Sequence, residues 1–342
     1  GMLLRSSKAK NYSRHKIKMG EVKIAVTGCG KWGINHVRTA YKLFGKDLKY
    51  CSDSLAESEK KVREISNDII FTIDMNEIIK DESVKAVIVS TPAETHFEIT
   101  KDLLNAGKNV LVEKPITLNS EEAKELNDIA LEKGLVLMVG HLLLYHPAIL
   151  KIKQYLDEGE LGNLQYIYSN RLNLGTIRTE ENILWSFAPH DISVIQYFTG
   201  DVPEEVTATG AIFVQKNIQD TTLTYLKFRN NIHAHIYVSW LHPFKEQRLV
   251  VIGSKAMMVF EDTLKENKLK LYRKGFEMVN GLPVKMDADF ENVEFDSTSP
   301  LELEQRHFID CILNNTTPRS DGKNAIEVLE TLERAQNELI KI

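Results

Sequence analysis

This sequence of 342 residues has little cysteine and no long apolar run. Its three cysteines, Cys29, Cys51 and Cys311, form no CxxC pair, which argues against a disulfide framework and a cysteine-rich zinc site. No apolar stretch approaches the ~20 residues of a membrane span, and residues 135–150 are interrupted by glycine, histidine and proline. We therefore expect a cytoplasmic protein without a membrane segment.

An excess of charge of one sign is also missing from most of the chain. Lysine and arginine number 43 against 48 acidic residues, and both signs are mixed, so no nucleic-acid partner is expected. Residues 1–20 differ, because they hold basic residues and no acid. They lack the apolar core of a secretory signal. We expect a disordered basic leader over 1–20.

A glycine-rich loop between a predicted strand and a predicted helix is the strongest motif present. Residues 22–27 are mostly apolar and run into Gly28-x-Gly30-x-x-Gly33, which an amphipathic pattern follows. In a dinucleotide fingerprint the first glycine makes the tight turn, the second lets the pyrophosphate approach, and the third lets helix and strand pack closely. The helix N-terminus offers N–H groups to the phosphates.

Asp53 closes the second predicted strand and indicates which dinucleotide binds. A carboxylate there accepts hydrogen bonds from the ribose hydroxyls and repels a 2′-phosphate, and no arginine stands beside it. The sequence therefore favours NAD over NADP. The alternative is that Asp53 only caps the helix that starts near Leu55.

From residue 22 to 141 short apolar strands alternate with amphipathic helices. The predicted strands are 22–27, 48–52, 69–72, 86–90, 109–113 and 135–139, and 95–106 is a helix between two of them. Strands that are apolar throughout are typical of a parallel sheet covered on both faces. We predict an α/β fold with a doubly wound parallel Rossmann domain over 21–141.

The pattern changes after about residue 150. Longer strands with partial alternation are predicted over 163–173, 205–215, 220–228, 232–240, 247–252 and 256–260, and a closing helix over 322–341. Little helix intervenes after residue 200, which indicates a large, open, mostly antiparallel sheet. We predict a C-terminal α+β domain over 142–342 that binds the substrate.

Three polar motifs end successive strands of the predicted Rossmann sheet. Val89-Ser-Thr-Pro92 with His96 follows the fourth strand, Glu113-Lys114-Pro115 the fifth, and Gly140-His141 the sixth. Ligands of open α/β sheets bind beyond the carboxyl ends of the strands. We therefore expect the active site at this edge.

Together with the glycine loop, Ala106-Gly107-Lys108 and His190, these motifs resemble the glucose–fructose oxidoreductase/inositol dehydrogenase (Gfo/Idh/MocA) family over residues 21–342. The resemblance implies an N-terminal Rossmann domain and a C-terminal domain whose large sheet forms homo-oligomers, as a dimer or tetramer. The residues expected to bind the NAD cofactor are Gly28, Gly30, Lys31, Trp32, Gly33, Asp53, Ser90, Thr91, Pro92, His96, Glu113 and Lys114.

Lys114 and His190 are the predicted catalytic residues. Oxidation of a secondary alcohol requires removal of a proton and stabilisation of an oxyanion, which an amine or ammonium can provide. Histidine suits proton transfer because its pKa lies near neutrality. The family usually carries acids where this chain has Ser186 and Ser193, which leaves the acid–base work to Lys114 and His190. The alternatives are a surface lysine and a packing histidine at a helix N-terminus.

Residues 171–178 and 182–191 are similar to nucleotide-sugar 3-dehydrogenases, which act at C3 of UDP-N-acetylglucosamine or its uronate. Arg171 and Arg178 can bind a diphosphate or uronate with paired hydrogen bonds, or they are ordinary surface charges. Trp185 can stack on a sugar ring. Tyr145 approaches the nicotinamide or simply packs. These four residues, with Lys114 and His190, form the predicted substrate site.

The sequence thus predicts an NAD-dependent dehydrogenase that oxidises the C3 hydroxyl of a UDP-activated N-acetyl amino sugar. A dehydrogenase of inositol or a free sugar with the same fold is one alternative, because it needs no diphosphate clamp. An NAD-binding redox sensor without turnover is another. No metal is predicted, since His233 and His235 share a strand face without a third ligand.

Overall fold

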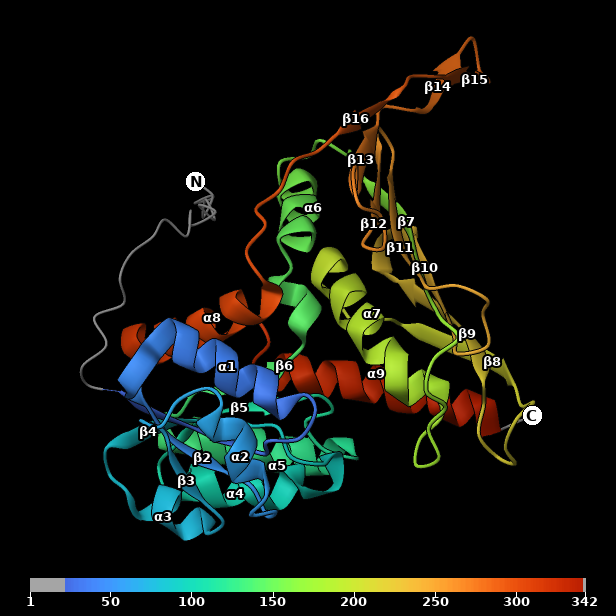
Figure 1. Cartoon of the computed structure of the whole chain (residues 1–342). Coiled ribbons are helices and arrows are strands. Elements are labelled where there is room, and N and C mark those ends of the chain that lie inside the picture. Colours follow the sequence, from blue (N-terminus) through green and yellow to red (C-terminus); the bar gives the residue numbers. More distant parts are fainter. Residues whose placement is uncertain (1–21, 341–342) are drawn as a thin grey trace.

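The computed structural model describes residues 22–340, so the predicted leader over 1–20 lies outside the described residues. Its N-terminal half is a six-stranded parallel sheet in the order β3-β2-β1-β4-β5-β6, which confirms the doubly wound prediction (Figure 1). The strands are β1 (Lys23–Thr27), β2 (Leu48–Ser52), β3 (Ile70–Thr72), β4 (Val84–Val89), β5 (Asn109–Glu113) and β6 (Leu137–Gly140).

Helices cover both faces of this sheet, and its strands are therefore apolar along their length. The helices are α1 (Gly33–Phe44), α2 (Ser58–Arg63), α3 (Met75–Lys80), α4 (His96–Asn105) and α5 (Ser120–Lys133). Helix α5 shows why the chain turns where it does. Asn119 accepts a hydrogen bond from the Glu122 N–H at its start, and Gly134 takes a left-handed conformation at its end.

The second half contains an eight-stranded sheet in the order β16-β13-β12-β11-β7-β10-β9-β8. Strands β7 and β10 pair parallel and the other neighbours pair antiparallel, as the sequence predicted for most of the sheet. The strands are β7 (Leu164–Leu172), β8 (Glu205–Ala211), β9 (Thr221–Phe228), β10 (Ile232–Ser239), β11 (Glu246–Gly253), β12 (Met257–Glu261), β13 (Leu269–Tyr272) and β16 (Phe290–Asn292).

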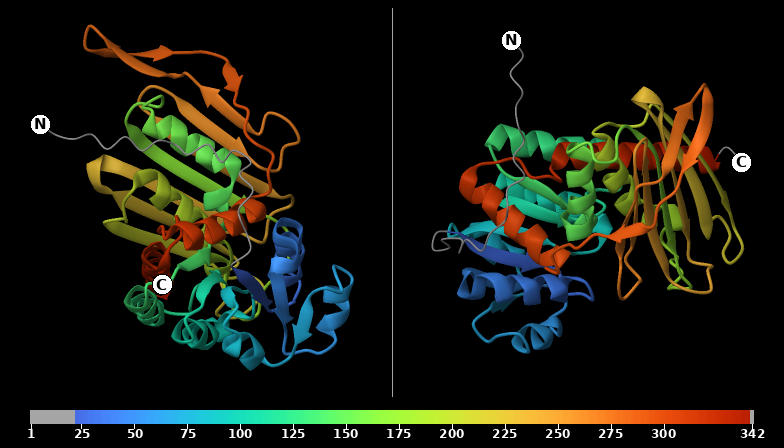
Figure 2. Two further views of the ribbon diagram at one scale, coloured as in Figure 1. Left: turned by 90° about the vertical axis from the view of Figure 1, so that its left-hand side faces the viewer. Right: turned by 90° about the horizontal axis from the view of Figure 1, so that it is seen from above.

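One face of this sheet is covered and the other is open. Helix α7 (Ile183–Thr199) packs on β7, β9 and β10, and the buried residues of these strands alternate with partly exposed ones. Figure 2 shows the sheet along one side of the molecule and the Rossmann domain on the other. Helix α6 (Pro147–Asp157) precedes β7 in the chain. The covered face supplies the core of this half.

The end of the chain returns to the Rossmann domain. Helix α8 (Pro300–Asn314) packs beside α1, and α9 (Gly322–Ile340) packs along α5 and α7 (Figure 1). In the segment that connects these two helices, the Ser320 carbonyl accepts a hydrogen bond of 2.8 Å from the N–H of Val139 in β6. Helix α9 lies within the predicted span 322–341, whereas α8 was not predicted.

A hairpin of β14 (Gly275–Val279) and β15 (Leu282–Met286) projects from the far edge of the large sheet (Figure 1). Its side chains are exposed on both faces, which is why no alternation was readable from the sequence there. Among the described residues, no helix has both the length and the apolar character to cross a membrane.

Candidate active site

The glycine loop has the geometry that a dinucleotide needs. Gly28 has φ +90°, and a Cβ there would lie 2.4 Å from the Ser90 carbonyl oxygen. A Cβ on Gly33 would lie 1.9 Å from the Gly28 carbonyl oxygen, so α1 could not approach β1 as it does. A Cβ on Gly30 would meet nothing within 4 Å, which leaves open space over the loop. These residues fit the NAD pyrophosphate.

Asp53 holds the loop in place from the end of β2. Its carboxylate accepts hydrogen bonds from the backbone N–H of Cys29 at 2.6 Å and of Leu55 at 2.9 Å. The second bond closes a turn ahead of α2, which begins at Ser58 with Glu57 at its N-cap, so Asp53 does not cap that helix. The first bond is a contact that the sequence did not indicate. The side chain is partly exposed, at the place where this fold binds ribose hydroxyls.

Glu113 at the end of β5 joins several predicted cofactor residues. It accepts hydrogen bonds from Trp32 Nε1 and from His36 Nε2, both at 2.6 Å. Burial opposes its charge, but the bonds from His36 and Trp32 hold the pKa of Glu113 below its ordinary value. Trp32 is 43% exposed and lies, with the exposed Lys31, beside the open side of the loop.

His96 lies behind the strand ends and is buried. Its ring nitrogens face the carbonyl oxygens of Pro115 at 2.7 Å and Thr91 at 2.8 Å. It therefore braces the segment Ser90–Pro92 against the segment that follows β5, where the Lys114–Pro115 peptide is cis. This placement makes His96 a support for the cofactor site, and Thr91 and Pro92 lie at its surface.

A pocket of about 250 Å³ opens next to this edge of the Rossmann sheet. It brings together both predicted catalytic residues and both predicted arginines, which come from distant parts of the chain. Its lining residues are Lys114, Arg171, Leu172, Asn173, Arg178, Ser186, Phe187, His190, Lys245 and Gln247.

The environment of Lys114 and His190 lowers the pKa of both groups. Burial lowers the pKa of Lys114, although Glu181 and Glu113 act in the opposite direction, and its Nζ donates to the Ser186 carbonyl at 3.1 Å. Burial and the charges of Lys114 and Arg171 hold the pKa of His190 well below 6.5. His190 is therefore neutral at pH 7, and its buried Nδ1 has no hydrogen-bond partner among the described residues.

His190 lies within α7 and not at its N-terminus. Asn182 caps the helix by accepting a hydrogen bond from the Trp185 N–H, and Pro189 sits inside it. Because proline has no N–H, the turn before His190 lacks one helical hydrogen bond. The alternative of a packing histidine at a helix start is wrong about this position, since the residue lines the pocket.

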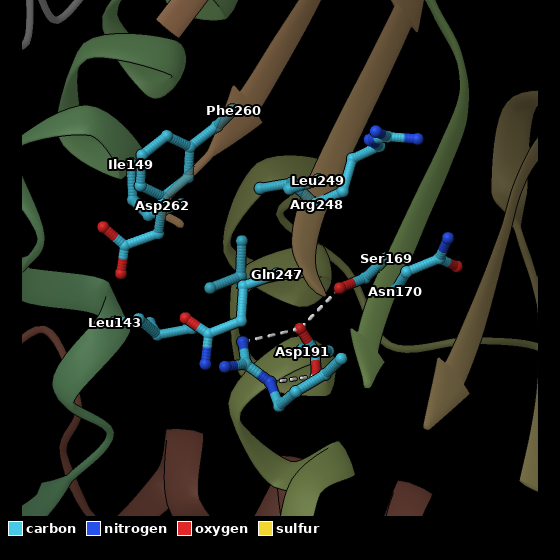
Figure 3. Close-up of a pocket in the computed structure, with 12 residues that line it drawn as sticks. Leu143, Ile149, Ser169, Asn170, Asp191, Gln247, Arg248, Leu249, Phe260 and Asp262 are labelled. Carbon is cyan, nitrogen blue, oxygen red and sulfur yellow. Dashed lines mark hydrogen bonds and ion pairs between the residues drawn. The ribbon is translucent and has the colours of Figure 1, made fainter. Parts of the chain in front are cut away.

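Arg171 is held by a buried carboxylate. Its guanidinium donates two hydrogen bonds to Asp191, at 2.9 and 3.0 Å, and Ser169 donates a third at 2.6 Å. Figure 3 shows Asp191 with these bonds, beside a smaller cavity of about 30 Å³ that reaches Phe260 and Asp262. Arg171 is thus already paired, unlike a free anion-binding arginine.

Two predicted substrate residues lie elsewhere. Tyr145 is buried and its hydroxyl bonds to Ser320 Oγ at 2.8 Å, and Trp185 donates from Nε1 to Gln336 at 3.1 Å. Neither lines the pocket. Trp185 contacts α9, and Tyr145 packs beside His307 of α8 and the segment 319–320, so the packing alternative that the sequence left open fits Tyr145.

Lys245 and Gln247 line the pocket but were not predicted. Lys245 lies between the predicted strands 232–240 and 247–252, and Gln247 begins the second of them; neither position indicates a meeting with Lys114. His233 and His235, by contrast, bond to the hydroxyls of Tyr225 and Tyr166 on the open sheet face.

A dinucleotide fold whose strand ends meet a lysine and a neutral histidine defines an NAD-binding oxidoreductase. Residues 22–141 match the oxidoreductase family with an NAD-binding Rossmann fold, and residues 149–259 match the GFO/IDH/MocA C-terminal domain. The chain belongs to the Gfo/Idh/MocA family, and its cofactor is NAD.

Relatives with named activities differ in substrate. The UDP-N-acetylglucosamine 3-dehydrogenase of Acidithiobacillus ferrooxidans is 30% identical over 72% of this chain and 76% of its own length. Its solved structure superposes with a TM-score of 0.82 at 25% identity, covering 94% of this chain and 98% of that one. The scyllo-inositol 2-dehydrogenase (NAD(+)) of Bacillus subtilis is 27% identical over 87% of this chain and 88% of its own.

Proposed function

We propose that this protein is an NAD-dependent dehydrogenase that oxidises the C3 hydroxyl of UDP-N-acetylglucosamine or its uronate. The observation that carries the reaction class is the presence of Lys114 and His190 in one pocket at the carboxyl edge of the Rossmann sheet. The likeness to the Acidithiobacillus enzyme, in sequence and in fold, supports the substrate.

The two residues divide the proton chemistry. NAD, when bound, accepts the hydride from the carbinol carbon. His190 is neutral at pH 7, so its unprotonated ring nitrogen is available to accept the hydroxyl proton, while burial and nearby cations lower its pKa and limit its strength as a base. Lys114 stabilises the developing oxyanion through its N–H groups, and its lowered pKa eases proton exchange with the substrate.

For the cofactor, we assign the pyrophosphate to the loop Gly28–Gly33 and the ribose to Asp53. Trp32, Ser90, Thr91, Pro92 and Glu113 surround the route toward Lys114. This order follows the strand order β2-β1-β4-β5, since each group stands at the carboxyl end of its strand.

An inositol dehydrogenase is the second candidate. The Bacillus subtilis scyllo-inositol enzyme matches a larger share of this chain than the nucleotide-sugar enzyme does. A sensor without turnover is a weaker candidate, because a sensor needs neither the buried lysine nor the neutral histidine in its pocket.

We also propose that the protein works in a reducing compartment such as the cytoplasm, as a homo-oligomer. The sequence has three cysteines and no paired framework of the kind that secreted proteins carry, which supports a reducing compartment. The open face of the large sheet is the proposed contact between subunits.

The test is single-turnover formation of NADH with UDP-N-acetylglucosamine and with its uronate, in the presence of a ketone-trapping reagent. Lys114→Met and His190→Asn should each lower the rate by roughly 10²–10⁴-fold, the usual contribution of a general acid–base group. NAD titration should change little in either variant. Near wild-type rates in both variants would remove these residues from the mechanism, and a wild type that forms NADH only with an inositol would favour the second candidate.

A further inference from the structure

Among the described residues, the charged side chains that line the substrate pocket are all basic: Lys114, Arg171, Arg178 and Lys245. The acids that face them, Asp191, Glu180 and Glu181, lie outside the lining. The four cations come from separate parts of the chain: the end of β5, strand β7, the loop after β7, and the loop between β10 and β11. Cations that converge on one hollow raise its potential and concentrate anions there.

These cations are not equally available. Arg171 makes two hydrogen bonds to the buried Asp191, so its charge is matched. Arg178 has a longer, exposed contact of 3.3 Å with Glu180. Within residues 22–340, no ion pair involves Lys245, and its side chain is exposed. Among the described residues Lys245 is therefore unpaired, and Arg178 has only an exposed contact with Glu180 that a ligand can replace.

The place of Lys245 and Arg178 differs from that of Lys114. Lys114 and His190 are partly buried, whereas both loop cations are exposed, so the reacting carbon lies deeper than the loop cations, which form the rim. At about 250 Å³ the pocket is smaller than the roughly 300–1,000 Å³ of sites that enclose a drug-sized ligand. A sugar ring fills it, and any larger attached group extends past the rim.

We propose that this site selects an anionic substrate and that Lys245, together with Arg178, binds the acidic group. The acidic group is a carboxylate on the sugar ring or a phosphate attached to it, since both present oxygens that accept charge-assisted hydrogen bonds. Neutral polyols such as inositols gain nothing from the two rim cations. The inference rests on the proposed function for the position of the reacting carbon beside Lys114 and His190.

The same charges explain the electrostatics of the pocket floor. The positive charges of Lys114 and Arg171 act on His190, and those of Arg178 and Arg171 act on Lys114, each lowering the pKa of the group it faces. An anion held at the rim offsets part of this mutual repulsion. Binding of an anionic substrate is thereby coupled to the protonation of the residues that do the chemistry.

The experiment compares Lys245→Met with wild type on five probes. The probes differ in their anionic groups. UDP-N-acetylglucosamine has phosphates as its only anionic groups, its uronate has phosphates and a ring carboxylate, and free N-acetylglucosaminuronate has the carboxylate alone. Free N-acetylglucosamine and scyllo-inositol are neutral. Trapped NADH formation gives kcat/KM, and the melting-temperature shift of the NAD-bound protein gives binding independently of turnover. Lys265→Met, an exposed lysine outside the pocket, is the matched control.

We expect Lys245→Met to lower kcat/KM or affinity by roughly 5- to 50-fold for the probes that carry the recognised anion and less than about twofold for the neutral ones. A loss confined to both UDP-sugars identifies the phosphate, and a loss confined to both uronates identifies the carboxylate. The control should behave as wild type.

Two results separate this inference from the proposed function. If UDP-sugars are oxidised but Lys245→Met affects charged and neutral probes equally, the role of Lys245 is overturned while the function stands. If only the free uronate is used, in a Lys245-dependent manner, the nucleotide-sugar assignment fails and anion selection stands. Preference for scyllo-inositol over every charged probe overturns both.

Discussion

Asp53 has two roles whose removal can be separated. Its carboxylate holds the Cys29 N–H and repels a 2′-phosphate, so we expect NADH to bind more tightly than NADPH. Asp53→Ala should weaken NADH binding by about tenfold, since it removes a charged hydrogen-bond acceptor. It should also reduce the difference in affinity between NADH and NADPH. Fluorescence titration with both cofactors measures the effect.

Asp53→Asn is the control, because it keeps an acceptor oxygen for the loop and removes the charge. Asp53→Asn should be more stable than Asp53→Ala, while its preference for NADH over NADPH should be lower than that of wild type. Tighter binding of NADPH by the wild-type protein would contradict the assignment.

Glu304 on α8 is buried, and neither of its oxygens has a hydrogen-bond partner among the described residues. Burial and the neighbouring Glu113 raise its pKa well above 4.5. A carboxyl group whose pKa is higher in the folded state than in the unfolded state makes its full contribution to the free energy of unfolding below pH 4.5. That contribution is lost as pH rises toward the folded-state pKa, by up to about 1.4 kcal/mol per pH unit. Glu304→Gln has no such loss.

We therefore expect Glu304→Gln to become progressively more stable than wild type between pH 5 and pH 8 in urea unfolding. The exposed Glu132→Gln on α5 is the control and should show no trend. The side chains of His36, Glu113 and Glu304 lie close enough together to suggest a metal site. Both ring nitrogens of His36 are already hydrogen-bonded, however, because Nδ1 accepts from Gln305 Nε2 and the His36 Nε2–H donates to Glu113. If Glu304→Gln were less stable than wild type only in the presence of divalent cations, Glu304 would instead be a metal ligand.

At the scale of residues, the sequence predicted what a local motif contains. Gly28, Gly33 and Lys114 are recognisable because turn geometry and strand ends fix their neighbours. Lys245 and Asp191 reach the site only through the packing of the large sheet and α7, which no local pattern encodes. Tyr145, for which the sequence left packing open, lies near the site along the chain but faces the core.

The turn between β1 and α1 allows a paired test at the scale of elements. Gly33→Ala forces α1 away from β1, because its Cβ would lie 1.9 Å from the Gly28 carbonyl oxygen. We expect a loss of roughly 1–3 kcal/mol in unfolding free energy and no measurable NAD binding. Gly30→Ala meets nothing within 4 Å and should keep wild-type stability while NAD binding falls.

Circular dichroism melts and NADH titration of both variants give the comparison. Equal stability of the two variants would show that helix–strand packing is not limited by Gly33. Retention of NAD binding by Gly30→Ala would place the pyrophosphate elsewhere.

Elements were predictable where burial repeats along them. The Rossmann strands are apolar on both faces, and β9 and β10 alternate, so their patterns carry the signal. Strands β14 and β15 have exposed side chains throughout, and no burial pattern marks them. Helix α8 was missed because buried polar residues, Glu304 and Gln305, interrupt its apolar face.

For the whole molecule we expect a solution mass above the 39.0 kDa of one chain. The open sheet face carries Tyr168 stacked on His235 and the 43% exposed Leu223, a surface suited to burial against a second copy. Tyr168→Glu with Leu223→Glu should shift the assembly toward the monomer in light scattering. Phe276→Glu on the projecting hairpin is the matched control, and dissociation by the hairpin variant alone would move the contact to that hairpin.

The return of the chain end to the Rossmann domain has a consequence for biosynthesis. Gln305 bonds to His36, Glu333 accepts a hydrogen bond from the Ser120 N–H, and Ser320 bonds beside β6. During synthesis at about 5–20 residues per second, the first 141 residues wait roughly 8–40 s before these partners are made. The nascent nucleotide-binding half leaves the ribosome with uncovered faces on α1 and α5, where a chaperone can bind until the last 40 or so residues emerge.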